Sequence, residues 1–157
     1  MMTTLEGDKK IKGKKFCVVA ARFNEYITKN LLAGCLAQLK ACGVNERDVW
    51  VVWVPGAFEI PVVALKMAQK KKIAAVICLG AIIRGETHHF DLVARGAAEG
   101  ISRVALETEK PVIFEVLVTN TLQQAYKRSE IKGNNKGQDA ALSAVKMVSL
   151  LTKLAKV

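Results

Sequence analysis

The stretch Ala74-Ala-Val-Ile-Cys-Leu-Gly80 decides the fold of this 157-residue chain. It is a short, uncharged apolar run that ends at a glycine, which is typical of a strand buried on both faces of a parallel sheet. Apolar runs of the same kind occupy 15–20, 49–54 and 111–117. The sequence therefore predicts four strands of one sheet.

Segments with helical periodicity separate and follow these runs. In 26–39 apolar residues recur every four positions and form one helix face. Comparable patterns occur in 60–68, 89–104 and 141–151, and the second of these three is rich in small residues, which indicates close packing against a neighbouring element. Alternating strands and helices predict a single-domain, three-layer α/β sandwich, with a four-stranded, mainly parallel sheet and helices on both faces.

The whole chain, 1–157, is expected to be one domain, because its length suits a single core, with 1–14 as a flexible N-terminal arm. The formal net charge is +10, and lysines gather in 9–15 and 70–72, outside the apolar runs. No aromatic residues interleave with them, as stacking platforms for nucleic acid would require. Since a positive field also attracts phosphorylated small molecules, we expect such a substrate and no nucleic-acid partner.

The sequence predicts a cytosolic protein with reduced cysteines and no membrane partner. No apolar run reaches the roughly 18 residues of a membrane span, and the first residues lack the apolar core of a secretory signal. None of the four cysteines forms a Cys-x-x-Cys pair or has zinc-ligand spacing. Two of them, Cys17 and Cys78, lie inside apolar runs, where a thiol packs as a small hydrophobe.

Ligands of such sheets bind beyond the carboxyl ends of the strands. This rule selects the segments 21–26, 55–61, 80–91 and 118–121. They hold nearly all of the polar residues suited to chemistry. The sequence therefore predicts a site built from these loops.

The most informative loop runs from Gly80 to Asp91. It leads into a helix, whose free N–H groups bind anions, and it contains the only histidines, His88 and His89. An imidazole is the natural proton shuttle at neutral pH. Two other interpretations stay open: these side chains cap the helix, or both histidines and Asp91 bind zinc.

Three further residues suit different parts of a small ligand: a flat ring, hydroxyl groups and a phosphate. Phe23 follows the first strand and forms either an aromatic wall or part of the core. Glu59 accepts hydrogen bonds from sugar-like hydroxyls or stabilises a helix N-terminus. Arg128 suits a phosphate clamp, and the glycine-containing segment 133–137 that follows is a turn-rich connection whose plainer interpretation is a solvated loop.

The motifs in these loops and strands resemble those of the 6,7-dimethyl-8-ribityllumazine synthase family. Five motifs occur in the family's order and spacing, and the match runs from about Lys14 to Leu151. The motifs are Ala21-Arg-Phe-Asn24, Trp53-Val-Pro-Gly-Ala-Phe-Glu-Ile-Pro61, Ile83-Arg-Gly-Glu-Thr-His-His-Phe-Asp91, Pro111-Val-Ile-Phe114 and Asn135-Lys-Gly137.

The resemblance implies a transferase of riboflavin biosynthesis that needs no cofactor. It condenses 5-amino-6-(D-ribitylamino)uracil with 3,4-dihydroxy-2-butanone 4-phosphate and releases phosphate and water. Phe23 is expected to stack on the pyrimidine. The residues expected to hold the uracil substrate are Ala57, Phe58 and Glu59, and those expected to read the pyrimidine edge through their backbone are Ala81, Ile82 and Ile83.

The resemblance also assigns the phosphorylated substrate and the proton transfer. Glu86 and Thr87 are expected to contact the phosphate, and His89 to be the catalytic proton-transfer residue. Three substrate-binding positions are expected to come from a neighbouring subunit or to lie near the ligand: Phe114, Arg128 and Lys136.

The family's assembly implies homopentamers, and in many members a shell of pentamers, with active sites shared between subunits. The short connection before the terminal helix favours the shell. Riboflavin synthase is a candidate partner. Three rival interpretations remain at this stage: a non-catalytic module that binds a flavin-like ligand at Phe23, a nucleotide-binding oxidoreductase without a Gly-x-Gly-x-x-Gly motif, and a nucleic-acid binder.

Overall fold

The four apolar runs form one parallel sheet in the computed structural model, which describes all 157 residues. The strands are β1 (Lys15–Ala21), β2 (Val49–Val54), β3 (Ile73–Ile83) and β4 (Val112–Thr119). They lie in the order β2-β1-β3-β4, so β2 and β4 are the edges. All three pairings are parallel, as predicted.

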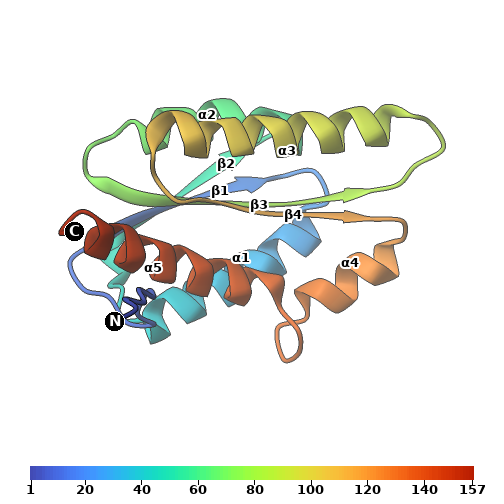
Figure 1. The fold of residues 1–157 in the computed structure, drawn as a ribbon. Helices are drawn as coiled ribbons and strands as arrows, with labels where there is room; N and C mark the ends of the chain where they lie inside the picture. The colour runs from blue at the N-terminus through green and yellow to red at the C-terminus, as the bar shows by residue number, and fades with distance from the viewer.

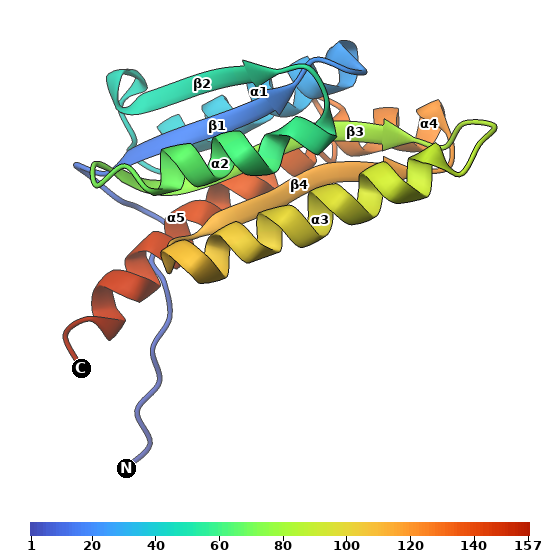
Figure 2. The same ribbon diagram turned by 90° about the horizontal axis from the view of Figure 1, so that it is seen from above.

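Five helices cover the two faces of the sheet, which confirms the predicted three-layer sandwich (Figures 1 and 2). α2 (Ile60–Ala68) and α3 (His89–Thr108) lie on one face, and α1 (Glu25–Ala41), α4 (Leu122–Ser129) and α5 (Lys136–Leu154) lie on the other. No helix of the chain combines the length and the apolar character needed to cross a membrane.

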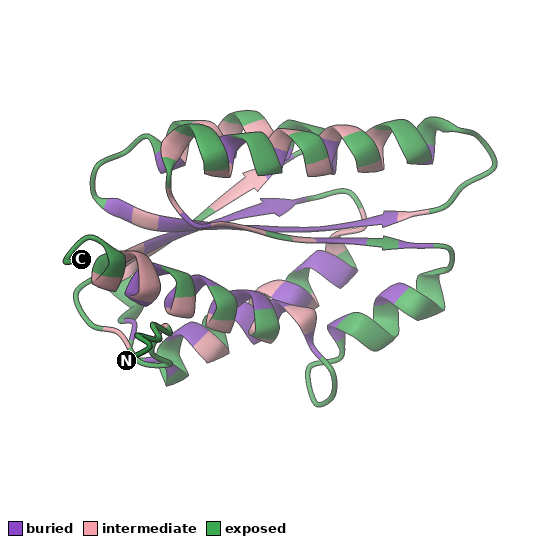
Figure 3. Cartoon of the chain, viewed as in Figure 1, coloured by how far each residue is buried: buried purple, intermediate pink, exposed green.

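Alternate residues of each strand enter two separate cores, one under each helical layer. In β1, Val18 packs toward α1 and α5, whereas Cys17 and Val19 pack toward α2 and α3. Figure 3 shows the result: the buried residues follow the strands, and the outer faces of the helices are exposed. All four cysteines are free and buried, which confirms the predicted core role of Cys17 and Cys78, and burial raises the pKa of Cys17 to about 12.

Two local predictions need correction. Gly80 does not end the third strand: β3 continues to Ile83, because β4 pairs with it as far as Ile83 and Thr119. The periodicity of the sequence also predicted no helix at 122–129, where α4 forms. Its composition is polar, but a capping box made by Thr121 and Gln124 satisfies its first turn, and that pattern was readable in the sequence.

Residues 1–14 precede β1 and contain no helix or strand. Asp8 nevertheless contacts α5: its backbone N–H donates to Ser149 Oγ at 3.0 Å, and its carboxylate accepts from Lys153 Nζ at 2.8 Å. The carboxylate also accepts from Ser149 Oγ at 3.0 Å, and the bonds from Lys153 and from this hydroxyl lower the pKa of the Asp8 carboxyl. The flexibility expected for this segment stays a prediction.

Candidate functional site

A cleft of about 740 Å³ opens where β1, β2 and β3 end, at the edge of the sheet that the sequence selected. Segments that follow β1 and β2, the end of β3 and the start of α3 line it. Most of the site residues predicted from the sequence lie in this lining: Phe23, Ala57, Phe58, Glu59, Ala81, Ile82, Ile83, Thr87 and His89. The fold thus gathers segments that are far apart in the chain.

Asn24 holds the loop after β1 in place. Its backbone is in the left-handed region, with φ 58°, which asparagine adopts more readily than most residues. Its side-chain Nδ2 donates to the carbonyl of Ala81 at 2.8 Å, and this bond ties the loop to β3. The preceding residue, Phe23, leaves 71% of its surface exposed, so its ring is free to contact a ligand rather than packing in the core.

The end of β3 projects beyond its neighbour β1. The last paired residues of the two strands are Leu79 and Ala20, whereas β3 continues to Ile83 along β4. The backbone N–H of Arg84 donates to Thr119 of β4 at 2.9 Å. Since successive residues of a parallel strand direct their backbone groups to opposite sides, Ala81 and Ile83 direct theirs toward the cleft side.

Phe58 forms one wall of the cleft by lying against α3. It belongs to a short 3-10 helix, η2 (Ala57–Glu59), that precedes α2. A Cβ placed on Gly96 would lie 2.5 Å from Cε2 of Phe58, and one on Gly100 would lie 2.6 Å from Cγ of Pro61. Only glycine allows α3 to come this close, which confirms the close packing predicted from its small residues.

The two histidines have different surroundings. His89, the first residue of α3, lines the cleft. His88 precedes the helix with a fully exposed side chain, and its Nδ1 lies 3.7 Å from Asp91 Oδ2. No group of three His, Cys, Asp or Glu side chains is arranged to hold a metal ion.

Arg84 braces the loop between β3 and α3. Its Nε donates to Oδ1 of Asn120, beyond β4, at 2.9 Å. Its guanidinium lies 4.4 Å from the ring centroid of Phe90 and 3.8 Å from Oδ1 of Asp91. The loop that carries Thr87 and the histidines is therefore held from two sides.

A family model described as 6,7-dimethyl-8-ribityllumazine synthase matches residues 13–152 of the chain. The chain belongs to the 6,7-dimethyl-8-ribityllumazine synthase family. It is a transferase of that class, and the family implies riboflavin biosynthesis with small-molecule substrates.

The remaining residues that the lumazine synthase resemblance assigns lie outside the lining of the cleft. Glu86 is in the loop between Gly85 and Thr87, both of which line it. The other three belong to the edge strand and the helices after it: Phe114 to β4, Arg128 to α4 and Lys136 to the first turn of α5. Phe114 and Arg128 are exposed. One chain therefore presents two separate groups of predicted site residues.

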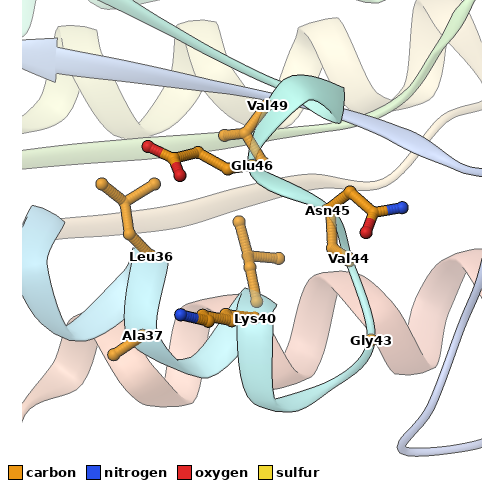
Figure 4. A pocket seen from close by; sticks show the side chains of 9 residues that line it. Leu36, Ala37, Lys40, Gly43, Val44, Asn45, Glu46 and Val49 are labelled. Carbon is orange, nitrogen blue, oxygen red and sulfur yellow. The ribbon is translucent and has the colours of Figure 1, made fainter.

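A second groove, of about 390 Å³, lies between the end of α1, the α1–β2 connection and the start of β2 (Figure 4). Its charged side chains are Lys40 and Glu46. It contains none of the residues predicted for the lumazine synthase site, and it lies away from the carboxyl ends of the strands. The larger cleft is therefore the candidate site.

Sequence reasoning missed the roles of Asn24, Arg84 and Asn135, although all three stand inside the lumazine synthase motifs. Asn135 is buried and caps α5: its Oδ1 accepts from the N–H of Gly137 at 2.9 Å. Asparagine before a predicted helix was the available signal for this cap. Nothing in the sequence pairs Arg84 with Asn120 or Asn24 with Ala81, because these contacts depend on the register of the folded sheet.

Proposed function

We propose that this chain condenses 5-amino-6-(D-ribitylamino)uracil with 3,4-dihydroxy-2-butanone 4-phosphate to 6,7-dimethyl-8-ribityllumazine and releases inorganic phosphate and water. The observation that carries the proposal is the convergence of Phe23, the projecting end of β3 and His89 on one cleft. These supply an aromatic face, backbone hydrogen-bonding groups and a proton carrier.

The uracil substrate is proposed to lie between Phe23 and the end of β3. A pyrimidine stacked on the exposed Phe23 ring presents its edge to the backbone of Ala81 and Ile83. The alternate donors and acceptors of a strand suit the alternate acceptors and donors of a uracil edge. Phe58 closes the wall, and Glu59 is placed in the same lining to accept hydrogen bonds from ribityl hydroxyls.

The phosphate of the second substrate is proposed to bind at the start of α3. This helix has 20 residues, and the free N–H groups and dipole at its N-terminus favour an anion. Glu86 would contact a phosphate through its backbone N–H, since two negative groups repel each other, whereas Thr87 also offers a hydroxyl. His89 is then beside the reacting carbon atoms and carries protons between amine, carbonyl and leaving oxygen.

Such a reaction asks the protein mainly to orient its substrates. They bring their own amine, carbonyl and phosphate leaving group, so neither a covalent nucleophile nor a cofactor is required. Correct orientation supplies roughly 7–11 kcal/mol of the barrier, and general acid–base help adds about 10²–10⁴-fold. One imidazole in a preformed cleft is sufficient for this task.

We further propose that a second copy of the chain completes each site. Phe114, Arg128 and Lys136 of one subunit would face Phe23 and His89 of the next. The separation of the two groups on one chain supports this arrangement, in homopentamers or a shell of pentamers. A cytosolic location and an association with riboflavin synthase belong to the same proposal.

Mixing the two purified substrates with the protein and following lumazine absorbance tests the reaction. We expect product and stoichiometric phosphate. Binding of a flavin-like ligand without turnover would replace the proposal with a non-catalytic binding module. Native mass measurement tests the assembly, and full activity of an isolated subunit would rule out the shared site.

A further inference from the structure

Arg84 lies directly after β3, and its side chain contacts both the start of α3 and the connection between β4 and α4. Its backbone N–H donates to Thr119 of β4 at 2.9 Å, so the sheet fixes the point from which the side chain leaves the backbone. The side chain lies outside the lining of the cleft. Arg84 therefore acts on a reaction in the cleft only through the residues that it contacts.

The first turn of α3 depends on support from outside the helix. His88, at the capping position, makes no side-chain bond to the helix, and Thr87 Oγ1 accepts from the His89 N–H only at a long 3.4 Å. The first N–H groups of a helix have no partners within it, and a first turn without a good cap is less stable. Under the proposed function these N–H groups must stay free for phosphate. The support therefore has to reach the helix through its side chains.

Arg84 supplies this support through two side chains of the first turn. Its guanidinium carbon lies 4.4 Å from the ring centroid of Phe90, which is buried in the core under α2 and α3. Its Nη2 lies 3.8 Å from Oδ1 of Asp91. A planar guanidinium stacks on a ring and pairs with a carboxylate at the same time. Since Phe90 directly follows His89, a hold on Phe90 also fixes the backbone that carries the imidazole.

The same guanidinium group is linked to Arg128, at the other end of the β4–α4 region. Nε of Arg84 donates to Oδ1 of Asn120 at 2.9 Å. The backbone N–H of Asn120 donates to Oε1 of Gln124 at 2.8 Å, and the backbone carbonyl of Gln124 accepts from Nη1 of Arg128 at 3.3 Å. An unbroken series of hydrogen bonds thus runs from Arg84 to Arg128.

We propose that Arg84 is a positioning residue that holds His89 and Arg128, which belong to the two separate groups of site residues, in a fixed relation to each other. This inference rests on the proposed function, in which His89 serves the site of its own subunit and Arg128 serves the site of a neighbour. Through the first turn of α3, Arg84 keeps the imidazole aligned for proton transfer. Through Asn120, it steadies the start of the helix that carries the phosphate clamp. One side chain therefore supports two neighbouring active sites.

The two sets of contacts predict different kinetic defects. Arg84→Met keeps a long, unbranched side chain but removes the charge and the donors, so both sets are lost. We expect kcat to fall about 10- to 100-fold, the cost of a misplaced catalytic group, and the KM for the phosphorylated substrate to rise several-fold. Asn120→Ala removes only the acceptor toward α4, so this KM should rise while kcat stays near that of the wild type. Asn120→Asp keeps an oxygen acceptor and should restore the wild-type KM.

Steady-state kinetics with both substrates measure these effects. Arg103→Met, the same change at an exposed arginine of α3 that pairs with Glu107, is the matched control and should behave as the wild type. Wild-type kinetics of Arg84→Met would overturn the proposal, and so would equal KM values for Asn120→Ala and Asn120→Asp. The two Asn120 variants keep the test decisive if Arg84→Met fails to fold.

A second experiment, hydrogen exchange of the ligand-free protein, tests the same contacts without substrate. Backbone amides in 91–95 and in 122–128 should exchange several-fold faster in Arg84→Met than in the wild type. In Asn120→Ala only those in 122–128 should change, and the amides of α5 should be unaffected in both variants. Unchanged exchange of both segments in Arg84→Met overturns the proposal. If exchange changes as expected while the wild type forms no lumazine, the assigned reaction fails and the support of two helices by Arg84 stands.

Discussion

The side-chain Nδ2 of Asn135 donates to the backbone carbonyl of Asn30 at 2.9 Å and so joins the cap of α5 to α1, 105 residues earlier in the chain. The same nitrogen donates to the carbonyl of Ser129, at the end of α4, at 3.1 Å. Asn135 therefore holds three helices together and fixes the point from which Lys136 projects.

Replacement of Asn135 by alanine should destabilise the fold. It removes three hydrogen bonds, each worth about 1 kcal/mol net, and leaves the buried N–H of Gly137 without its acceptor. We expect a loss of about 2–3 kcal/mol and a lower Tm in calorimetry, by roughly 2–4 °C per kcal/mol. Asn134→Ala, at the exposed neighbouring position, should leave the Tm unchanged, and equal effects of the two variants would contradict this role.

Replacement of His89 should slow the reaction, whereas replacement of His88 should not. His89→Ala removes the imidazole that lines the cleft, and we expect kcat to fall by about 10²-fold or more with the KM values largely kept. His88→Ala changes a fully exposed side chain and should retain activity near that of the wild type. Steady-state kinetics of both variants decide the assignment, and the reverse pattern would transfer the proton-transfer role to His88.

Arg128→Ala should weaken use of the phosphorylated substrate. A charged hydrogen bond contributes about 1.5–3 kcal/mol, so we expect the KM for that substrate to rise roughly 10- to 100-fold. The KM for the uracil substrate should change little. Arg103→Ala, which removes an exposed arginine of α3 paired with Glu107, is the matched control. An equal loss for both substrates would argue against a phosphate clamp.

Gly96→Ala should disturb the uracil site through Phe58. The new methyl group would lie 2.5 Å from Cε2 of the ring, so the ring must leave its place on α3. We expect a several-fold higher KM for the uracil substrate. Combining Gly96→Ala with Phe58→Ala should cost less than the sum of the two single changes, and a double-mutant cycle measures this coupling. Simple additivity would show that the two residues do not interact.

The pH dependence of stability should reveal Glu115, a half-buried acid in the middle of the edge strand β4. Its folded pKa of about 7 lies above the value of 4.5 for an exposed glutamate, so the folded state disfavours the charged form. The free energy of unfolding therefore decreases as the pH rises from about 4.5 to 7, and the penalty stays constant above that range. The Tm of Glu115→Gln minus that of the wild type should therefore be larger at pH 8 than at pH 5. For a half-buried, solvent-screened group we expect about 1 kcal/mol, or roughly 2–4 °C.

The sequence predicted the layers of the fold because periodicity reports directly which residues face a core. Strand 49–54 agrees with the structure at both ends, and Cys17 and Cys78 are buried as expected. The extension of β3 to Ile83 could not be predicted, because Gly80 is a strand terminator in isolation and becomes a strand residue only when β4 pairs with it.

The candidate site was predictable to the extent that topology determines it. Ligands of parallel sheets bind beyond the carboxyl ends of the strands, and this rule selected the loops that carry Phe23, Glu59 and His89. The folded chain brings these residues to one cleft. The contacts that fix the geometry, such as Arg84 with Asn120, join loops whose spatial relation is absent from the linear sequence. The charge behaviour of Glu115 likewise arises only when α5 lies beside β4.

The projecting end of β3 makes selectivity for the pyrimidine tolerant of side-chain substitutions at positions 81 and 83. Under the proposed function, the heterocycle is recognised by main-chain atoms of Ala81 and Ile83, which every amino acid except proline supplies in the same positions. Side chains there can drift as long as the strand keeps its register with β4. The preference for the pyrimidine then depends on strand pairing rather than on side chains, and a proline at position 81 or 83, which removes the backbone N–H, is the replacement expected to abolish it directly.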